Sequence, residues 1–313
     1  MKNEKANIYP KKLLIVGSSN TDMVVKADHL PQPGETVLGD TFLMNPGGKG
    51  ANQAVAAARI GVSVTFICKI GDDIFGQQSH QLLKEEGIDT SYIFFDAQHP
   101  SGVALIIVDS HAENSIAVAS GANANLFPKD LEKIEKVITD ADMILMQLEI
   151  PIETVEYVTR IASAQARKVI LNPAPACPLS KELLTNLYLI TPNKTEAEIL
   201  SGVKITDTIS ARTAAIEICR LGVKNVVITL GREGALVYNN HEFTEIEAPK
   251  VKAVDTTAAG DVFNGTLCAA LLEGQTLEEA VQFACKAASV SVTRCGAQDS
   301  APYRNEIGSI TFK

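Results

Sequence analysis

Short runs of apolar, largely β-branched residues recur along the chain and are separated by longer, more polar segments. The runs are nearly continuous rather than alternating, which is typical of parallel strands that helices cover on both faces. We therefore expect six buried strands, at Lys12–Gly17, Val64–Ile70, Met143–Leu148, Lys168–Pro173, Leu187–Asn193 and Asn225–Gly231.

Segments in which apolar positions recur with helical spacing lie between these runs. They predict helices at Gly50–Ile60, Phe75–Glu86, Lys129–Ile138, Ile152–Ala164, Lys194–Ser201 and Ser210–Leu221. Alternation of strands and helices at this spacing indicates an α/β protein with a mostly parallel central sheet and helices on both faces, a three-layer α/β/α fold. The pattern does not determine the order of the strands in the sheet.

Two regions break this alternation. Residues Met23–Met44 contain MVVKAD, the turn LPQPGE and TVLGDTFLM, and residues Tyr92–Ala119 contain YIFF, GVALIIVD and NSIAVAS. Both predict short strands without helices between them, so we expect a small separate antiparallel sheet that serves as a lid, an interface or both. The alternative is a set of hairpins at the edge of the main sheet. Since no repeat or linker divides the chain, residues 1–313 are predicted to form a single domain, with lid strands inserted at about 23–44 and 92–119.

Composition narrows the class of protein. A chain of 313 residues can bury a large core, and its net charge of −9 argues against a nucleic-acid partner, because phosphate backbones are bound by clustered Lys and Arg. No apolar stretch of roughly eighteen residues and no signal-peptide core is present, so we expect a cytoplasmic protein that does not contact a membrane. The cysteines show no C-x-x-C pair and are expected to be buried free thiols: Cys68, Cys177, Cys219, Cys268, Cys285 and Cys295.

The segment NPGGKGANQAVAAARIG, Asn45–Gly61, places three glycines and a lysine before an Ala-rich helix. Small residues let a ligand approach the backbone, and the helix N-terminus offers N–H groups without intrahelical partners. The segment is neither a Walker loop nor the G-x-G-x-x-G fingerprint of dinucleotide-binding folds. By itself it is as consistent with a plain glycine-rich turn as with a ligand site.

Polar side chains follow two of the predicted strands. Asn20 and Asp22 lie in GSSNTDM after the first strand, and Glu149 follows another strand in MQLEIP. Ligands of open α/β sheets bind beyond the carboxyl ends of the strands, and an amide beside a carboxylate matches several hydroxyls of a polyol. Turn formation is the alternative role for these residues.

The stretch VDTTAAGDVFNG holds two carboxylates, Asp255 and Asp261, around residues that cannot titrate, and an apolar helical segment follows. A helix N-terminus stabilises negative charge, and Ala258, Ala259 and Gly260 have little side chain to obstruct a phosphate. An aspartate at this position can accept a proton from a hydroxyl nucleophile while N–H groups hold the transferring phosphoryl group. A helix cap would explain Asp261 alone, but not the small residues before it.

The motifs GGKGANQA and DTTAAGDVFNG closely resemble the two signatures of ribokinase-type (PfkB) carbohydrate kinases. The resemblance extends over essentially the whole chain, through GSSNTD, QLEIP, NPAPA, TPNKTEAE, TLGREGA and TRCGAQDS. It implies a ribokinase-like fold with a small β-sheet lid and ATP-dependent phosphorylation of a sugar. The lysine of GGKGAN and the NTD element favour D-ribose, phosphorylated at its 5-hydroxyl, over adenosine or ketodeoxygluconate.

Alternative functions remain at this point. Another pentose, deoxyribose or a nucleoside is a possible substrate, because one hydrogen-bonded hydroxyl decides such discrimination. A sugar sensor without catalysis is a third hypothesis, which the intact Asp261 and its small-residue turn argue against.

The resemblance also implies roles for individual residues. Asp261 would be the catalytic base, and the N–H groups of Ala258, Ala259 and Gly260 would form an anion hole. The sugar hydroxyls would be held by Asn20, Asp22, Gly48, Lys49, Asn52, Glu149 and Asp261. ATP would lie along Asn193, Glu196, Thr229, Gly231, Gly234, Gly260 and Cys285, with Asn193 and Glu196 linked to Mg²⁺ and phosphate positioning. A monovalent cation activator, K⁺, would bind Asp255, Thr257, Ser291, Arg294, Gly296 and Ser300, several of them through backbone carbonyls.

The chain departs from the family pattern at one turn position. Many members have Gly-Ala-Gly-Asp where this chain has Ala258-Ala259-Gly260-Asp261, and an alanine fits there if its φ angle is negative. Cys285 is expected near the adenine, where a thiol has no evident physical reason. The resemblance further implies a homodimer formed through the lid, and the apolar SGVALIIVD segment is compatible with a lid face that a partner buries.

Overall fold

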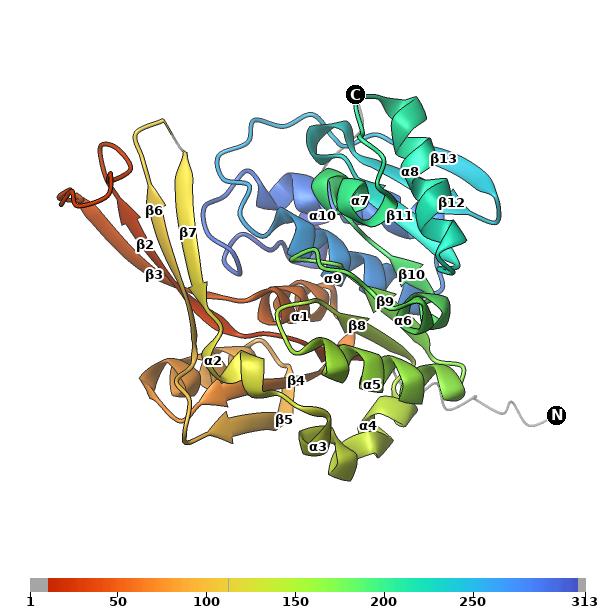
Figure 1. Ribbon diagram of the computed structural model, residues 1–313, viewed down its shortest axis with the longest axis horizontal. Coiled ribbons are helices and arrows are strands. Elements are labelled where there is room, and N and C mark those ends of the chain that lie inside the picture. The colour runs from red at the N-terminus through yellow and green to blue at the C-terminus, as the bar shows by residue number, and fades with distance from the viewer. Residues whose placement is uncertain (1–10, 112, 309–313) are drawn as a thin grey trace.

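A nine-stranded, mostly parallel sheet forms the centre of the molecule (Figure 1). The computed structural model describes residues 11–111 and 113–308. Neighbouring strands are parallel from β11 to β5, whereas β12 and β13 are antiparallel to their neighbours. The order across the sheet is β13 (Glu242–Ile246), β12 (Ala235–Asn239), β11 (Asn225–Thr229), β10 (Leu189–Ile190), β9 (Lys168–Leu171), β8 (Met143–Met146), β1 (Lys12–Val16), β4 (Ser63–Gly71) and β5 (Asp89–Asp96). All six strands predicted from the apolar runs are members of this sheet.

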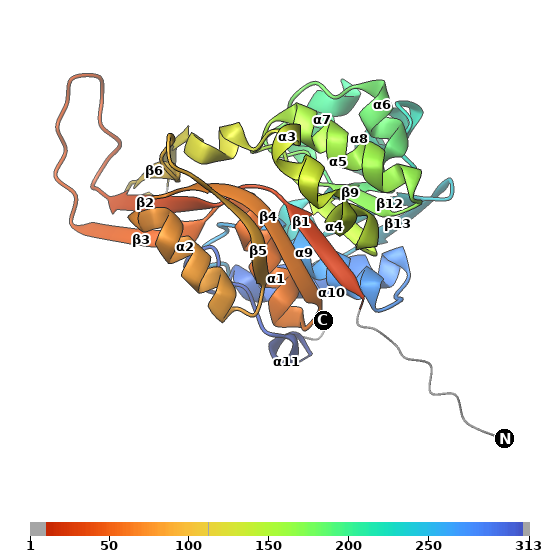
Figure 2. The ribbon, with the colours of Figure 1, turned by 90° about the horizontal axis from the view of Figure 1, so that it is seen from below.

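Helices cover both faces of the sheet, as the alternation of elements predicts (Figure 2). One face carries α1 (Lys49–Ile60), α2 (Ile74–Glu85), α9 (Ala259–Leu272), α10 (Leu277–Ser291) and α11 (Arg304–Ile307). The other carries α3 (Pro128–Leu131), α4 (Glu135–Asp140), α5 (Ile152–Ala164), α6 (Lys181–Asn186), α7 (Lys194–Ser201) and α8 (Thr208–Arg220).

The central strand β1 shows why its sequence is continuously apolar. Leu13 and Ile15 point into the core beneath α1, α9 and α10, while Leu14 and Val16 point into the core on the opposite face. All four side chains are buried, because successive side chains of a strand face opposite sides and both sides are covered. The three-layer α/β/α prediction is therefore confirmed.

The prediction of one continuous helix at Lys129–Ile138 is wrong. It consists of α3, a 3-10 turn at Glu132–Ile134 and α4. The backbone of Ile134 leaves the helical region, with φ −120° and ψ 15°. The break lets Leu131 and Ile138 both reach the core, where each is fully buried.

A separate four-stranded sheet projects from one end of the main body (Figure 1). Its order is β3 (Thr41–Gly47), β2 (Asn20–Lys26), β6 (Gly102–Val108) and β7 (Asn114–Ala119). Strands β2 and β6 are parallel, and the two outer pairs are antiparallel. The two strand-rich regions of the sequence thus meet in one small sheet, whose function as a lid stays a prediction.

The YIFF segment at the start of the second strand-rich region was assigned to the wrong sheet. It forms β5, which pairs in parallel with β4 at the edge of the main sheet. The physical reason is burial on two sides, because Ile93 packs into one core while Tyr92 and Phe94 pack against the other. The expected insertion therefore contributes to the small sheet only from Gly102 onwards.

Among the residues that the structure describes, no helix has the length and apolarity that crossing a membrane requires.

All six cysteines lie in the described ranges and are free thiols. Cys68, Cys268 and Cys285 are buried, whereas Cys295 is exposed, contrary to the expectation of burial.

Candidate active site

A cavity of about 780 Å³ lies between the small sheet and the carboxyl ends of the main-sheet strands. Asn20 and Asp22 reach it from β2, and Glu149 reaches it from the loop after β8. Asp261 reaches it from the first turn of α9. All seven residues predicted to hold a sugar line this one cavity: Asn20, Asp22, Gly48, Lys49, Asn52, Glu149 and Asp261.

Within the glycine-rich segment, the residue immediately before α1 must be glycine for a steric reason. This residue is Gly48. Its φ of 89° favours glycine, and an added Cβ would lie 2.7 Å from Asn20 N and 2.8 Å from Ser19 Cα. The absence of a side chain lets the start of α1 pack against the backbone that leads into β2. Lys49 is thereby placed beside Glu149, whose Oε2 accepts hydrogen bonds from Lys49 N at 3.2 Å and from Ser18 Oγ at 2.6 Å.

Asn123 is a lining residue of this cavity that sequence reasoning missed. Its Nδ2 donates to Asn20 Oδ1 at 2.8 Å, and its Oδ1 accepts from Ser19 N at 2.9 Å. It also donates to Ser120 O at 3.0 Å, at the point where the chain leaves the small sheet. Asn123 therefore orients Asn20, but its GANAN context contains no motif that could have revealed this contact.

Three carboxylates surround one lysine in the cavity. Burial raises the pKa of Asp22 to about 6, and the negative charges of Glu149 and Asp261 add to this effect while Lys49 opposes it. The pKa of Lys49 is raised chiefly by the charge of Asp261, although burial acts in the opposite direction. The cluster therefore carries an excess of acceptors over donors, which suits a ligand rich in hydroxyl groups.

Asp261 is buried, and both of its oxygens accept hydrogen bonds from side-chain amides of α1. Asn52 Nδ2 donates to Oδ2 at 3.0 Å, and Gln53 Nε2 donates to Oδ1 at 2.9 Å. Burial raises the pKa of Asp261, whereas the charge of Lys49 and the two amide donors lower it. A buried carboxylate with a raised pKa is a stronger proton acceptor than an exposed one, and its orientation is held from two sides.

The turn before Asp261 has a conformation that the sequence did not reveal. Ala258, the residue before α9, has φ 56° and ψ 11°, so the condition of a negative φ is not met. The left-handed conformation costs roughly 1–2 kcal/mol for a residue with a Cβ. Helical bonding begins with Val262 N donating to Ala258 O at 2.9 Å, so the N–H groups of Gly260 and Asp261 precede the helical ladder.

A second cavity, of about 860 Å³, lies on the other side of this turn. Its walls include the apolar side chains of Val251, Phe263 and Val292. Five of the residues predicted to contact ATP line it, namely Thr229, Gly231, Gly234, Gly260 and Cys285. Burial raises the pKa of the Cys285 thiol to about 12, so this side chain is a neutral, small apolar group in the wall.

The two cavities share the turn that leads into α9. Thr257, Ala258 and Asp261 line the first cavity, whereas Thr256, Ala259 and Gly260 line the second. A ligand in one cavity and a ligand in the other therefore approach the same few residues. The arrangement allows a group to be transferred between two ligands across a helix N-terminus, with a buried carboxylate at the meeting point.

Asn193 and Glu196 are not among the residues lining these two cavities. They form a reciprocal cap at the start of α7, in which Asn193 N and Nδ2 each donate to Glu196 at 2.8 Å, and Glu196 N donates to Asn193 Oδ1 at 2.9 Å. Asn193 pairs with Thr229, a residue of the second cavity. Burial raises the pKa of Glu196, and the charges of Lys49 and Asp261 also affect it, so the cap lies within electrostatic range of the site.

The residues predicted to bind a monovalent cation come from the loop before α9, from the last residue of α10 and from the loop after α10. Asp255 joins the loops, because its carboxylate accepts from Thr257 N and from Gly296 N, each at 2.9 Å. Partial burial acts to raise the pKa of Asp255, but these hydrogen bonds lower it below its ordinary value. Among the residues 11–111 and 113–308, no group of three or more His, Cys, Asp or Glu could hold a metal. The predicted set contains one carboxylate, and its other donors would be hydroxyl and backbone carbonyl oxygens, which suit a weakly bound monovalent cation better than Zn²⁺.

The remaining members of this predicted set lie close by in the chain. Arg294 N donates to Ser291 O at 3.0 Å, and the Arg294 side chain forms an ion pair with Glu306 at 2.5 Å. Ser291 and Ser300 are both buried. The Arg294 guanidinium is therefore engaged elsewhere, and only its backbone carbonyl is consistent with the predicted role.

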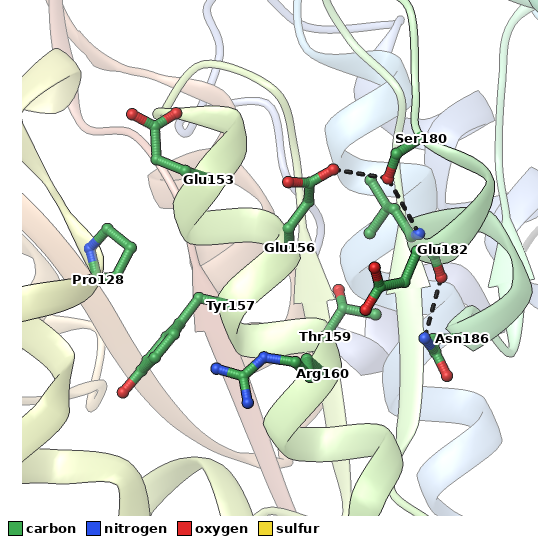
Figure 3. A pocket seen from close by; sticks show the side chains of 10 residues that line it. Pro128, Glu153, Glu156, Tyr157, Thr159, Arg160, Ser180, Glu182 and Asn186 are labelled. Atoms are coloured by element: carbon green, nitrogen blue, oxygen red, sulfur yellow. Dashed lines mark hydrogen bonds between the residues drawn. The ribbon is translucent and has the colours of Figure 1, made fainter.

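A third pocket, of about 280 Å³, lies between α5 and α6 and contains none of the predicted site residues (Figure 3). Its polar groups bond to one another, with Ser180 Oγ donating to Glu156 at 2.6 Å and Asn186 Nδ2 donating to Glu182 O at 2.9 Å. It shares one lining residue, Glu153, with the first cavity and none with the second.

Comparison with known proteins shows the family of the chain. The model of the pfkB family of carbohydrate kinases matches residues 10–304. The chain belongs to this family. A pfkB-family relative from Haemophilus influenzae, named ribokinase, is 46% identical over 296 residues, which cover 95% of this chain and 97% of the relative.

Two further comparisons place the chain within the family. A Salmonella typhi protein named deoxyribokinase is 35% identical over 291 residues, covering 93% of this chain and 95% of that protein. The solved structure of Arabidopsis thaliana ribokinase complexed with ribose and ATP is similar with a TM-score of 0.90 at 31% identity, covering 96% of this chain and 98% of that one. The pfkB-family fold thus extends over nearly all of both chains.

Proposed function

We propose that this pfkB-family protein transfers the terminal phosphoryl group of ATP to the 5-hydroxyl of D-ribose. One observation carries the proposal, namely that two cavities meet across the turn at the N-terminus of α9, with buried Asp261 at the meeting point. The names of its relatives, and the ribose and ATP bound in a structural neighbour, support the choice of sugar and nucleotide.

Asp261 acts as the base in this reaction. Its buried carboxylate accepts the proton of the attacking hydroxyl, and the two amide donors hold it in one orientation during the transfer. The N–H groups at the start of α9 stabilise negative charge that develops on the transferring phosphoryl group. Ala258, Ala259 and Gly260 permit this approach because none has a side chain larger than a methyl group.

The sugar is held by the polar groups of the first cavity. Asp22 and Glu149 accept hydrogen bonds from hydroxyl groups, and Lys49 donates one. Asn52 offers a further acceptor, because within the described part of the chain its buried Oδ1 has no hydrogen-bond partner. A buried acceptor without a partner is costly unless a ligand satisfies it, which supports its role toward a hydroxyl.

ATP occupies the second cavity, with its phosphates directed at Gly260. Mg²⁺, when bound, would neutralise the phosphate charge, and Glu196, whose pKa responds to the charges of Lys49 and Asp261, is the carboxylate that we propose helps to position it. K⁺ would be held by Asp255 together with backbone carbonyls of the loop containing Gly296. In that role Asp255 joins the cation loop to the turn before α9 through its hydrogen bond with Thr257.

Deoxyribose is the second candidate substrate, because one relative carries the name deoxyribokinase. Another pentose or a nucleoside requires a different fit in the first cavity. We further propose that the enzyme acts in the cytoplasm, which supplies ATP and keeps the six free cysteines reduced, and that it forms a homodimer through the small sheet.

The test is ATP turnover with D-ribose, 2-deoxyribose, fructose and adenosine, each with and without K⁺. We expect D-ribose to give the highest kcat/KM and K⁺ to raise it. Asp261→Asn should lower kcat by several orders of magnitude and largely preserve sugar binding, because it removes the base but not the shape of the site. Preference for another substrate would overturn the choice of sugar, and near-normal turnover of Asp261→Asn would remove this residue from the role of base.

A further inference from the structure

Gln53 contacts Asp261 from the protein interior, where it is fully buried and does not line the first cavity. Its Nε2 donates both to Asp261 Oδ1 at 2.9 Å and to Asn172 Oδ1 at 3.1 Å. Its Oε1 accepts from Gln147 Nε2 at 2.5 Å. The residue therefore joins the carboxylate of α9 to polar side chains that follow β8 and β9.

A second branch returns from Asn172 to the turn before the carboxylate. Asn172 Nδ2 donates to Thr191 O at 3.3 Å, and Thr191 Oγ1 donates to Asn264 Oδ1 at 2.5 Å. Asn264 Nδ2 donates to Gly260 O at 2.8 Å. Since Gly260 and Asp261 are neighbours in the chain, these bonds close a ring. The ring holds the turn and the carboxylate from the side of the protein interior.

The directions of the bonds that join Gln53 to Asp261 and to Gln147 follow from Asp261. An ionised carboxylate only accepts, so Gln53 must present its NH₂ group to it and its Oε1 to Gln147. Gln147 must then donate, and its own Oε1 is left buried without a partner among the described residues. A buried acceptor without a hydrogen-bond partner costs free energy. If these amides only paired with one another in the core, they would not have to leave an acceptor unpaired. The orientation is therefore imposed by the carboxylate.

We propose that Gln53 is a positioning residue for phosphoryl transfer, which orients Asp261 and keeps it in its ionised, proton-accepting form. This inference rests on the proposed function, since it concerns the base of that reaction. Asn52 holds the other oxygen but faces the cavity, where a bound sugar competes for its amide. Gln53 has no contact with the cavity, so its hydrogen bond persists whether or not the sugar is bound.

The experiment compares Gln53→Met and Gln53→Glu with the unmodified enzyme over a range of pH. Met preserves the length of the side chain but cannot donate, and Glu preserves its shape but adds a negative charge. Both should lower kcat by roughly 10- to 100-fold, as expected for the loss of a hydrogen bond to a charged group, with a change of less than about threefold in the KM for D-ribose. The acidic limb of the kcat profile should move up by about one pH unit, and further for Glu, because the ionised form of Asp261 loses its donor.

Two comparisons separate positioning from a structural role. Thr266→Val is the control, because it deletes a fully buried polar atom of α9 that has no partner in the described structure. This variant should leave kcat and the pH profile unchanged. In the Asp261→Asn background, Gln53→Met should cause little additional loss of kcat, because the two residues act on the same step.

Each outcome decides the inference. An unshifted acidic limb in folded Gln53→Met, or a full further loss in the Asp261→Asn background, would overturn it. If Gln53→Met yields no folded protein, the decision passes to Gln53→Glu, where a limb that moves upward supports the inference and an unmoved one overturns it. Absence of ribose turnover in the unmodified enzyme would instead contradict the proposed function.

Discussion

At the scale of single residues, the first cavity brings like charges together. Asp22, Glu149 and Asp261 are close enough to affect one another, and Lys49 is the cation that opposes them. Such a site is electrostatically unfavourable when empty, since burial and repulsion both act against ionised carboxylates. Hydroxyl groups of the proposed sugar would relieve this cost by donating hydrogen bonds, which would couple sugar binding to carboxylate ionisation.

This coupling predicts that D-ribose affinity falls in acid. With a pKa raised to about 6, Asp22 is mostly ionised at pH 7 and mostly protonated at pH 5, where it loses the capacity to accept two hydrogen bonds. The Kd for D-ribose without ATP, measured by calorimetry, should rise by roughly tenfold for each pH unit below about 6. Asp22→Asn should bind more weakly at all pH values and lack this dependence; a constant Kd between pH 7 and pH 5 in the unmodified enzyme would contradict the assignment.

At the scale of elements, the site depends on the close packing of α1 and α9. Gly265 makes that packing possible, because a Cβ at this position would lie 2.4 Å from Gln53 O and 2.9 Å from Ala56 Cβ. Gln53 and Asp261 are therefore brought within hydrogen-bond distance by a glycine one helical turn after the aspartate. The last residue of the DTTAAGDVFNG motif thus has a packing role, distinct from the turn at its start.

Gly265→Ala should weaken both stability and catalysis. The added methyl group overlaps the backbone of α1, so the two helices must separate, at a cost of about 1–3 kcal/mol in the free energy of unfolding. The separation should also lengthen the bond between Gln53 and Asp261 and lower kcat. Denaturant unfolding and steady-state kinetics measure the two effects. Gly308→Ala is the matched control, since its Cβ would enter open space, and equal behaviour of the two variants would contradict the packing argument.

At the scale of the whole molecule, the first cavity is formed by two different sheets. Ile106 and Val118 of the small sheet face Glu149 and Asp261 of the main body across it. A displacement of the small sheet would therefore change the shape of the first cavity, the proposed sugar site. The opposite face of the small sheet carries a row of residues that the strand register aligns, namely Met44, Met23, Leu105 and Ala117.

This apolar row predicts association of two copies. Leu105 is 56% exposed in the single chain, and a partner sheet would bury it together with Met44. We expect the protein to be a dimer by light scattering and Leu105→Glu to shift it toward monomer. Ile209, which is 76% exposed, lies on α8, a helix on the opposite side of the molecule from the small sheet (Figure 1), so Ile209→Glu should leave the dimer intact. A monomeric unmodified protein would refute this interface.

Strong local patterns explain which features could be predicted. The continuous apolar runs located six strands because parallel strands are buried on both faces. The glycines and small residues marked two turns that line the cavities, and all seven residues predicted to contact the sugar line the first one. Helix α10 was not predicted, although its buried residues, among them Leu277, Val281 and Val290, recur at helical spacing.

Features that depend on distant partners could not be predicted. Gln53 and Asn123 have ordinary sequence contexts, and their hydrogen bonds to Asp261 and Asn20 join segments far apart in the chain. The left-handed turn at Ala258 was missed because alanine rarely adopts a positive φ without tertiary constraint.

The sequence by itself determined the class of fold, the positions of the buried strands and the small-residue turn that carries Asp261, since these depend on hydrophobic period and on local steric freedom. The tertiary structure alone decided the order of the strands, the membership of β5 in the main sheet and the ring of hydrogen bonds behind Asp261. The physical reason is that burial and hydrogen bonding are satisfied between segments far apart in the chain, and no local pattern specifies which segments meet.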